Sequence, residues 1–353
     1  MHAIFMTQLV DQRDPALGFA VGWIQALAAR TDRVTVIANE VRRTDLGPGV
    51  EVVSLGKERG AGKAARGMNL ERAVIGATGR RPAMLLAHMC PDYLSLAAPV
   101  AQLRGVPTIL WFAHPSVTYR LAVAERLADG IVTSLPGAYP RESSKVRVIG
   151  QAVDTGALAF DPRSPSADAP RLLALGRTSP AKGFDHIVRA VARVRADGLQ
   201  ATLHIVGPST TDAEQAHAAE LASIVDELDL RDAITIGPGV PPAEVPQLIA
   251  TADILVNAMI GGSGDKVVFE AMALGRPVLV SNPAFSALIG DLPLELSFVR
   301  EDEGSLASAI HRLAGADPTE TDATLRTLRR RVVRGHSVDH WAEAVLAFAE
   351  ELR

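Results

Sequence analysis

The stretch LLALGRTSPAKGFDHIVRAV, residues 172–191, joins an apolar run to a pattern typical of an amphipathic helix. The apolar run ends at Gly176, and the helical pattern begins near Asp185. Turn-prone residues and two cations, Arg177 and Lys182, lie between them. The order of strand, loop and helix is the repeating unit of a parallel β-sheet, so this stretch predicts an α/β fold.

The same alternation extends along both halves of the chain. Strand-like apolar runs cover residues 2–8, 33–39, 50–55, 83–88, 107–113 and 130–135, then 171–176, 201–207, 233–237, 253–258 and 276–281. Helical patterns cover residues 19–30, 92–105, 116–130, 185–198, 213–230, 242–252 and 266–275. Continuous apolar strands separated by helices predict parallel sheets that are covered on both faces.

This order divides the chain into two Rossmann-like, doubly wound parallel-sheet domains. We expect an N-terminal domain over residues 1–153 and a second domain over 171–335, joined by a Pro-, Ala- and Asp-rich linker at 154–170. A last helix covers 336–353, and its packing back on the N-terminal domain is one arrangement we consider. Ligands of open parallel sheets bind beyond the carboxyl ends of the strands, so the expected site is a central cleft that the two sheets face.

Composition and charge limit the classes of function. The chain has 353 residues, 48% of them hydrophobic, and a formal net charge of -4, which gives no general attraction to nucleic acid or acidic membranes. Cys90 is the single cysteine, and we expect it to be a small buried side chain. The N-terminal residues lack the features of a signal peptide, and no apolar run is long enough to span a bilayer. We therefore expect a cytoplasmic protein, with peripheral attachment to the inner membrane face left open.

The two cations of the opening stretch lie where anions bind. A helix N-terminus attracts anions through its free N–H groups, and Arg177 and Lys182 would add a planar fork and a movable point charge. Such a site suits a doubly charged group such as a diphosphate. The alternative is two solvated surface cations, and the spacing alone does not decide between them.

A second stretch, ILVNAMIGGSGDKVVFEAMALGRPVLVSNP at 254–283, has a glycine-rich loop between a strand and a helix. Because Gly261, Gly262 and Gly264 have no side chains, the backbone N–H groups of this loop can approach a ligand. Glu270, one turn into the helix, can accept two hydrogen bonds from a cis-diol such as a ribose. The alternative is a helix-surface carboxylate, which its apolar neighbours disfavour.

Together the two stretches resemble glycosyltransferase family 4, the retaining nucleotide-sugar glycosyltransferases of the GT-B fold. The resemblance implies that Arg177 and Lys182, in the G-R-x-x-x-x-K-G pattern, hold the donor diphosphate. It implies that Glu270, before AMALGRPV, binds the ribose and that the amides of Lys266 and Val267 reach the phosphates. The sequence departs from the family signature in one respect.

That departure concerns the first of two glutamates that the family places eight residues apart. Gly262 stands at its position, so Asp265 or a shifted loop is expected to contact the donor sugar, with Gly264 beside it. In the N-terminal half, Gly18 matches the glycine whose loop amides approach the donor phosphates. His114, after the strand 107–113, matches a histidine near the transferred sugar, with a loop histidine as the alternative.

The resemblance implies transfer of a hexose from an NDP-sugar, of UDP or GDP type, to a hydroxyl of a glycan, lipid-linked or small-molecule acceptor, with retention. We expect Arg177, Lys182 and His114 to be catalytic. There is no D-x-D triplet to hold a metal, and His336 and His340 lack a third ligand, so we expect neither metal nor cofactor. Other GT-B enzymes such as an epimerase or phosphorylase, and a non-catalytic NDP-sugar-binding protein, remain alternatives. A dehydrogenase is disfavoured because no G-x-G-x-x-G follows the first strand.

Three segments remain without a decisive residue. The base of the nucleotide is expected to meet the backbone of residues 237–240. Acceptor specificity is expected in the loops 41–72 and 88–95. The segment 41–72 is locally basic. Its cations are either solvated or contact an anionic acceptor or lipid headgroup; they are Lys57, Arg59, Lys63, Arg66 and Arg72.

Overall fold

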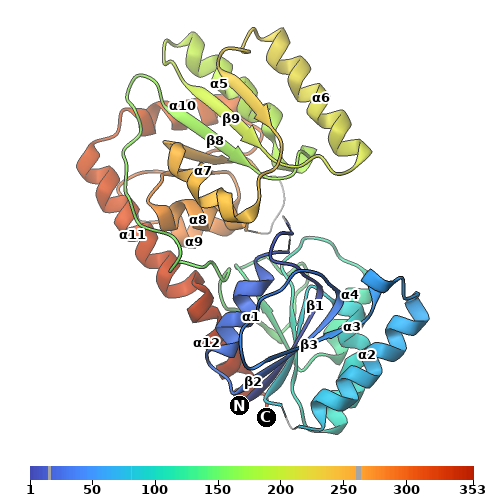
Figure 1. Cartoon of the computed structure of the whole chain (residues 1–353). Coiled ribbons are helices and arrows are strands. Elements are labelled where there is room, and N and C mark those ends of the chain that lie inside the picture. The colour runs from blue at the N-terminus through green and yellow to red at the C-terminus, as the bar shows by residue number, and fades with distance from the viewer. Residues whose placement is uncertain (15–16, 81, 260–263) are drawn as a thin grey trace. The chain divides into compact units, whose positions relative to one another are not determined.

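The structure is a computed structural model that describes residues 1–14, 17–80, 82–259 and 264–353. The chain divides into two compact units (Figure 1). The first comprises Met1–Asp154 and Gly335–Arg353, and the second comprises Thr155–Arg334. Each unit is built on one sheet whose described strand pairs are all parallel, which confirms the predicted fold class of two α/β domains.

The first unit contains a seven-stranded sheet in the order β3-β2-β1-β4-β5-β6-β7. Its strands are β1 (His2–Val10), β2 (Arg33–Val41), β3 (Val50–Ser54), β4 (Met84–His88), β5 (Thr108–Trp111), β6 (Gly130–Thr133) and β7 (Val146–Val148). Its helices are α1 (Ala20–Ala28), η1 (Lys57–Arg59), α2 (Lys63–Thr78), α3 (Pro91–Leu103), α4 (Tyr119–Leu127) and α12 (Val338–Glu351).

Helices cover both faces of this sheet because side chains alternate along each strand. Phe5 of β1 belongs to a core cluster with residues of α1 and α12. Its neighbours Ile4 and Met6 belong to a second cluster with residues of α2, α3 and α4. The sheet is therefore apolar on both faces, as the continuous hydrophobic strands predict.

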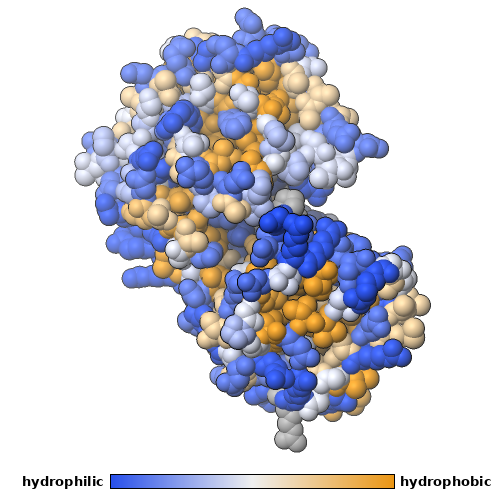
Figure 2. All heavy atoms as spheres, in the orientation of Figure 1, coloured by the Kyte–Doolittle hydropathy of each residue, from blue (hydrophilic) through white to orange (hydrophobic). Residues whose placement is uncertain are grey.

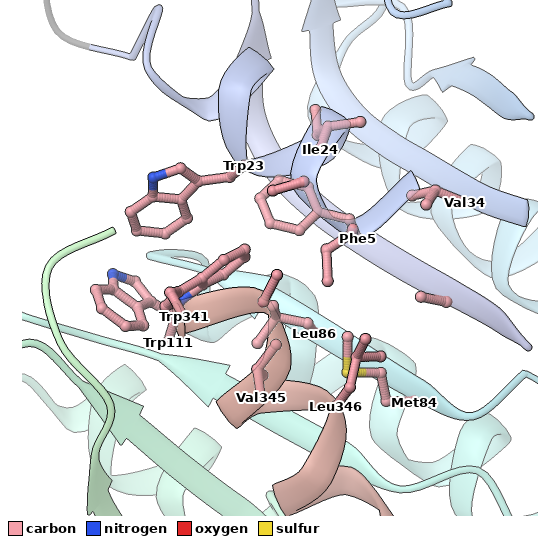
Figure 3. Close-up of a cluster of buried hydrophobic side chains, with 14 of the residues drawn as sticks. Phe5, Trp23, Ile24, Val34, Met84, Leu86, Trp111, Trp341, Val345 and Leu346 are labelled. Atoms are coloured by element: carbon pink, nitrogen blue, oxygen red, sulfur yellow. The ribbon is translucent and has the colours of Figure 1, made fainter. Parts of the chain in front are cut away.

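Three tryptophans connect α12 to this core (Figure 3). The ring centroids of Trp23 and Trp341 are 4.5 Å apart, and those of Trp23 and Trp111 are 4.9 Å apart. The indole N–H of Trp23 donates to the carbonyl of Ala152 at 2.9 Å, which satisfies its polar atom inside the core. The C-terminal helix thus lies against α1 of the first unit.

The second unit contains a five-stranded sheet in the order β10-β9-β8-β11-β12. Its strands are β8 (Arg171–Leu175), β9 (Thr202–Val206), β10 (Ile234–Gly237), β11 (Ile254–Asn257) and β12 (Val278–Val280). Its longer helices are α5 (Phe184–Ala196), α6 (Asp212–Glu227), α7 (Val245–Thr251), α8 (Lys266–Leu274), α10 (Glu303–Ala314) and α11 (Pro318–His336), the last two residues of which belong to the first unit. Short turns are η2 (Pro180–Lys182), η3 (Pro242–Glu244), η4 (Pro283–Phe285) and α9 (Ser286–Ile289).

Some segments differ from the expectation. Residues 63–72 and 91–95 are not loops, because α2 and α3 begin at Lys63 and Pro91. Residues 155–170 belong to the second unit, where the amide of Asp161 donates to the carbonyl of Leu274 at 3.1 Å. The buried guanidinium of Arg276 also donates to the carbonyl of Asp161. None of the helices in the described ranges combines the length and apolar character that crossing a membrane demands.

Each sheet has one place where the strand order reverses. In the first sheet it lies between β1 and β4, and in the second it lies between β8 and β11. Loops leave the two neighbouring strands in opposite directions there, which opens a crevice at the carboxyl ends where ligands of such sheets bind. Polar side chains at these two places are therefore candidates for ligand binding.

Candidate active site

The loops that follow β8 and β11 meet at the reversal point of the second sheet. Lys182 ends η2, and Asp265 directly precedes α8. The Nζ atom of Lys182 lies 2.5 Å from Oδ2 of Asp265 and 3.7 Å from Sδ of Met259. The exposed fractions of these two charged side chains are 16% and 21%, so the ion pair is largely shielded from water.

Glycines allow this close approach. Gly183 has a φ of +61°, and a Cβ atom there would lie 2.7 Å from the carbonyl oxygen of Ala258 in the β11 loop. Gly176 has a φ of +146°, and a Cβ atom there would lie 2.7 Å from Cε of Lys182. The aliphatic stem of Lys182 therefore lies directly over Gly176, which holds the ammonium group near the end of the strand.

Asp265 is the N-cap residue of α8, but its carboxylate does not cap the helix. Its Oδ2 atom instead accepts from Nδ2 of Asn257 at 2.8 Å and from Lys182. The first amides of a helix have no intrahelical partner, and here the N-cap side chain does not use them. The N-terminus of α8 thus keeps its preference for an anion, next to the Lys182 ammonium.

Glu270 lies one turn into α8. Its side chain is 15% exposed, and its Oε1 atom lies 3.5 Å from Nζ of Lys266. A shielded carboxylate this close to the helix N-terminus can accept hydrogen bonds from neighbouring hydroxyl groups of a ligand whose anionic part lies at the helix end. Lys182, Asp265, Lys266, Val267 and Glu270 are thus gathered around one end of α8, with Gly264 adjacent in the chain.

Arg177 is held by a carboxylate that the sequence analysis missed. Its Nε atom donates to Oε1 of Glu214 at 2.7 Å, and its Nη2 atom pairs with the same oxygen. The other oxygen of Glu214 accepts from the hydroxyl of Thr210 at 2.8 Å and from the amides of Thr210 at 2.7 Å and Thr211 at 3.1 Å. The Thr210 hydroxyl, ahead of these amides and Arg177, lowers the pKa of Glu214 to about 2. Glu214 is buried, whereas the Arg177 side chain is 59% exposed, so one end of the guanidinium is fixed and the rest is accessible.

A sequence signal for Glu214 exists. Thr211 and Glu214 form a capping box at the start of α6, with the hydroxyl and carboxylate each bonding the other residue's amide. The pattern Thr-x-x-Glu before an apolar helix is the usual signature of this motif. That Glu214 also reaches Arg177 depends on β8 and β9 being neighbours, which no local pattern states.

The remaining predicted residues lie elsewhere. Gly261 and Gly262 are outside the described residues. Gly18 and His114 belong to the first unit. The amide of Gly18 already donates to the carbonyl of Asp14 at 2.9 Å, and a Cβ atom at Gly18 would lie 2.6 Å from that same oxygen. Gly18 therefore serves a tight turn before α1.

His114 is exposed in the loop after β5. Its Nδ1 atom accepts from the amide of Ser116 at 3.1 Å. In the neutral ring the proton therefore lies on Nε2, which is the nitrogen that can donate to a ligand.

Three other groups of the first unit, Cys90, His88 and His336, are structural. Cys90 is 1% exposed, which confirms the prediction of a buried side chain, and burial raises the pKa of its thiol far above the usual range. His88 lies among Phe5, Phe19 and Trp23, and burial lowers its pKa to about 4. His336 accepts from the amide of Gln151 at 3.2 Å. Among the described residues, no three His, Cys, Asp or Glu side chains are grouped as metal ligands are.

Comparisons with known proteins bear on this geometry. Residues 169–316 match the family model described as Glycosyl transferases group 1. D-inositol 3-phosphate glycosyltransferase of Kineococcus radiotolerans is 33% identical over 156 residues, which are 40% of this chain and 35% of that protein. The 2-deoxystreptamine glucosyltransferase of Streptomyces kanamyceticus is 27% identical over 73% of this chain and 74% of its own. A GDP-mannose-dependent alpha-(1-6)-phosphatidylinositol monomannoside mannosyltransferase of Mycobacterium tuberculosis is 26% identical over 54% of this chain and 55% of its own. The match thus spans from about a third to three quarters of these relatives.

Solved structures agree over nearly the whole chain. HepE of Anabaena, in complex with UDP and glucose, has a TM-score of 0.74 at 18% identity and covers 99% of this chain and 100% of its own. A glycosyltransferase of Rickettsia africae has a TM-score of 0.73 at 13% identity, covering 99% and 98%. The fold is therefore GT-B. The match to the group 1 glycosyl transferases covers residues 169–316, which lie in the second unit, and it agrees with the resemblance of the motifs to glycosyltransferase family 4.

Proposed function

We propose that this chain transfers a hexose from a nucleoside-diphosphate sugar to an acceptor hydroxyl, with retention at the anomeric carbon. The observation that supports this most is the position of Lys182 Nζ beside a helix N-terminus that the Asp265 carboxylate does not cap. Glu270 follows within one turn of the same helix. A diphosphate at this helix end would bring the adjoining ribose within reach of Glu270.

The chemistry follows from the charge that develops. The bond from the anomeric carbon to the diphosphate oxygen breaks, and its electron pair leaves with the diphosphate. The acceptor oxygen bonds to the same face of the sugar, and its proton passes to the leaving phosphate. Lys182, Arg177 and the first amides of α8 stabilise the departing anion, which is the largest electrostatic task of the reaction. The proposal therefore assigns this neutralisation to the chain's own cations and needs no metal ion.

Asp265 and His114 receive supporting roles in this proposal. Asp265 stands in for the first glutamate of the family signature and accepts hydrogen bonds from hydroxyls of the donor sugar. Its present partner, Lys182, is also the cation that the diphosphate needs, so the donor and Asp265 share one ammonium group. His114 donates from Nε2 to orient the sugar and is not an obligatory base.

The donor is proposed to be a UDP- or GDP-sugar. HepE was solved in complex with UDP and glucose, and the M. tuberculosis relative is named as GDP-mannose-dependent. The test is a panel of UDP-, GDP- and ADP-sugars, with mass spectrometry of the nucleoside diphosphate released with and without acceptors. A transferase releases the diphosphate faster when its acceptor is present and remains active in EDTA. Donor binding without release would instead indicate a non-catalytic binding protein, and loss of turnover in EDTA would contradict the role assigned to the cations.

A further inference from the structure

A group of polar side chains lies at the reversal point of the first sheet, where the proposed reaction does not yet use them. We call this group the Arg66 cluster, and it consists of Gln8, Asn39, Arg66 and Tyr93. Gln8 and Asn39 lie near the carboxyl ends of β1 and β2. Tyr93 lies in the first turn of α3, just after β4, and Arg66 lies in the first turn of α2. The strand order therefore places these four residues at the carboxyl edge of the sheet, where open α/β sheets bind ligands.

The cluster is organised around the guanidinium of Arg66. Its Nη1 atom donates to Oδ1 of Asn39 at 2.6 Å, and Nδ2 of Asn39 donates to Oε1 of Gln8 at 3.3 Å. Asn39 is only 4% exposed, so it fixes Arg66 from within the fold. The Nε atom of Arg66 is buried and has no hydrogen-bond partner among the described residues. Buried donors are nearly always satisfied in folded proteins, so this donor indicates a missing acceptor.

Tyr93 adds a second donor. Burial raises the pKa of Tyr93 to about 12, against smaller opposing effects from the Arg66 charge and from hydrogen bonding with Gln8. The phenol therefore keeps its proton over the physiological range. A protonated phenol at this edge of the sheet can donate to an oxygen-rich ligand.

The neighbouring cations differ in whether a carboxylate pairs with them. Lys57 pairs with Glu40 at 2.9 Å, and Arg59 pairs with Glu58 at 2.8 Å. Within the described part of the chain, no carboxylate lies within 4.0 Å of Arg66, and the same holds for Lys63 and Arg72. Lys63 precedes Arg66 by three positions on α2, which places both on one side of the first turn. Hydrophilic residues also gather where the chain enters α2 on the face in Figure 2.

We propose that the Arg66 cluster binds a phosphate group carried by the acceptor. This inference rests on the proposed transfer, because it names the chemical class of the acceptor. A half-buried guanidinium with an unused N–H, a protonated phenol and a nearby ammonium group present several donors, which the terminal oxygens of a phosphate can satisfy together. The phosphate is either the monoester of a free polyol or sugar phosphate, with three terminal oxygens, or the diester of a lipid headgroup, with two; both are anionic and accept hydrogen bonds.

The first test titrates the full chain with inorganic phosphate and counts the binding sites. Calorimetry or ³¹P NMR measures the binding. Because Lys182 also attracts phosphate, the titration is repeated on Lys182→Gln. When Arg66→Gln is added to Lys182→Gln, the phosphate affinity of the remaining site should fall by about 10- to 100-fold, as expected for losing a charged hydrogen bond. Asn39→Asp, which supplies the missing carboxylate, should weaken it as well. Arg66→Lys should restore part of the affinity, and Arg72→Gln, an exposed cation of the same helix, should change nothing.

The second test separates the two sources of phosphate. Glycerol 3-phosphate is compared with glycerol, and vesicles that contain phosphatidylinositol in a phosphate-free glycolipid are compared with vesicles of the glycolipid alone. Binding of either phosphate-bearing probe that is lost in Arg66→Gln and Asn39→Asp supports the proposal and identifies the source. Equal binding by wild type and both variants, or no phosphate binding in Lys182→Gln, overturns it. UDP binding by Arg66→Gln reports separately on the donor site, so failure of the proposed transfer is distinguished from failure of this inference.

Discussion

The ammonium group of Lys182 and the carboxylate of Asp265 lie 2.5 Å apart, although 83 positions separate them in the chain. They meet because β8 and β11 are neighbours in the sheet, whereas β9 and β10 lie on the other side of β8. The pair is mostly shielded from water, so its attraction is stronger than that of a surface ion pair. The cation proposed to hold the donor diphosphate is thus already positioned by an internal anion.

Replacement of Lys182 should remove the strongest stabilisation of the leaving group. We expect Lys182→Ala to lower kcat by ~100-fold or more, as loss of a single donor to a developing anion usually does. Arg177→Ala should act in the same direction. Arg189→Ala, which removes an exposed cation from the middle of α5, is the matched control and should leave kcat unchanged. Steady-state release of nucleoside diphosphate measures all three, and normal turnover in both Lys182→Ala and Arg177→Ala would refute the assignment.

Replacement of Asp265 should separate donor binding from transfer. In Asp265→Asn the diphosphate no longer competes with a carboxylate for Lys182, so the nucleoside diphosphate should bind about threefold to tenfold more tightly. Transfer should fall by about tenfold, because a charged acceptor for the sugar hydroxyls is lost. Calorimetry of nucleotide binding and kcat measured on the same preparation provide the comparison. Weaker nucleotide binding together with undiminished kcat would contradict both roles.

Glu214 should act through Arg177. Its pKa of about 2 means that it stays ionised at every pH used for assays, so a neutral isostere tests the charge itself. We expect Glu214→Gln to keep the fold but lower kcat by about tenfold, because a charged hydrogen bond to the guanidinium is lost. In the background of Arg177→Ala the same change should have little further effect. Additive losses in the double variant would show that Glu214 acts independently of Arg177.

The first unit should lose stability in mild acid. Burial lowers the pKa of both His88 and His336 to about 4, below the usual value of 6.5. Because the unfolded chain binds these protons first, the free energy of unfolding should fall as the pH drops from 6.5 towards 4, by about 2 kcal/mol per histidine between pH 7 and 5. Urea unfolding at the two pH values, compared with His88→Gln, measures this. An equal pH dependence in the variant would show that His88 is not responsible.

Much of the fold could be predicted from the sequence. Long apolar strands with glycine-rich loops gave correct positions for β8, β11 and α8, because the hydrophobic pattern and the turn residues agree there. Helix α2 was missed because its first turns contain glycine and several charged residues and bury little before Leu70. Helix α11 was also not predicted, although its buried residues Leu325, Leu328 and Val332 recur at helical spacing.

The pairing of side chains within the candidate site was harder to foresee. Arg177 and Lys182 were identified as cations near a helix start, but their partners Glu214 and Asp265 come from distant segments. Local patterns specify strands and caps, whereas which strands become neighbours depends on packing of the whole sheet. For the same reason the proximity of Arg66 to Asn39 could not be read from a basic segment alone.

The most direct measurement is a crystal structure of the chain with UDP or GDP bound. We expect the diphosphate oxygens within hydrogen-bond distance of Lys182 Nζ and of the first amides of α8, with both ribose hydroxyls on Glu270. A nucleotide bound elsewhere, or one whose phosphates leave the Lys182–Asp265 pair and the end of α8 untouched, would contradict the account.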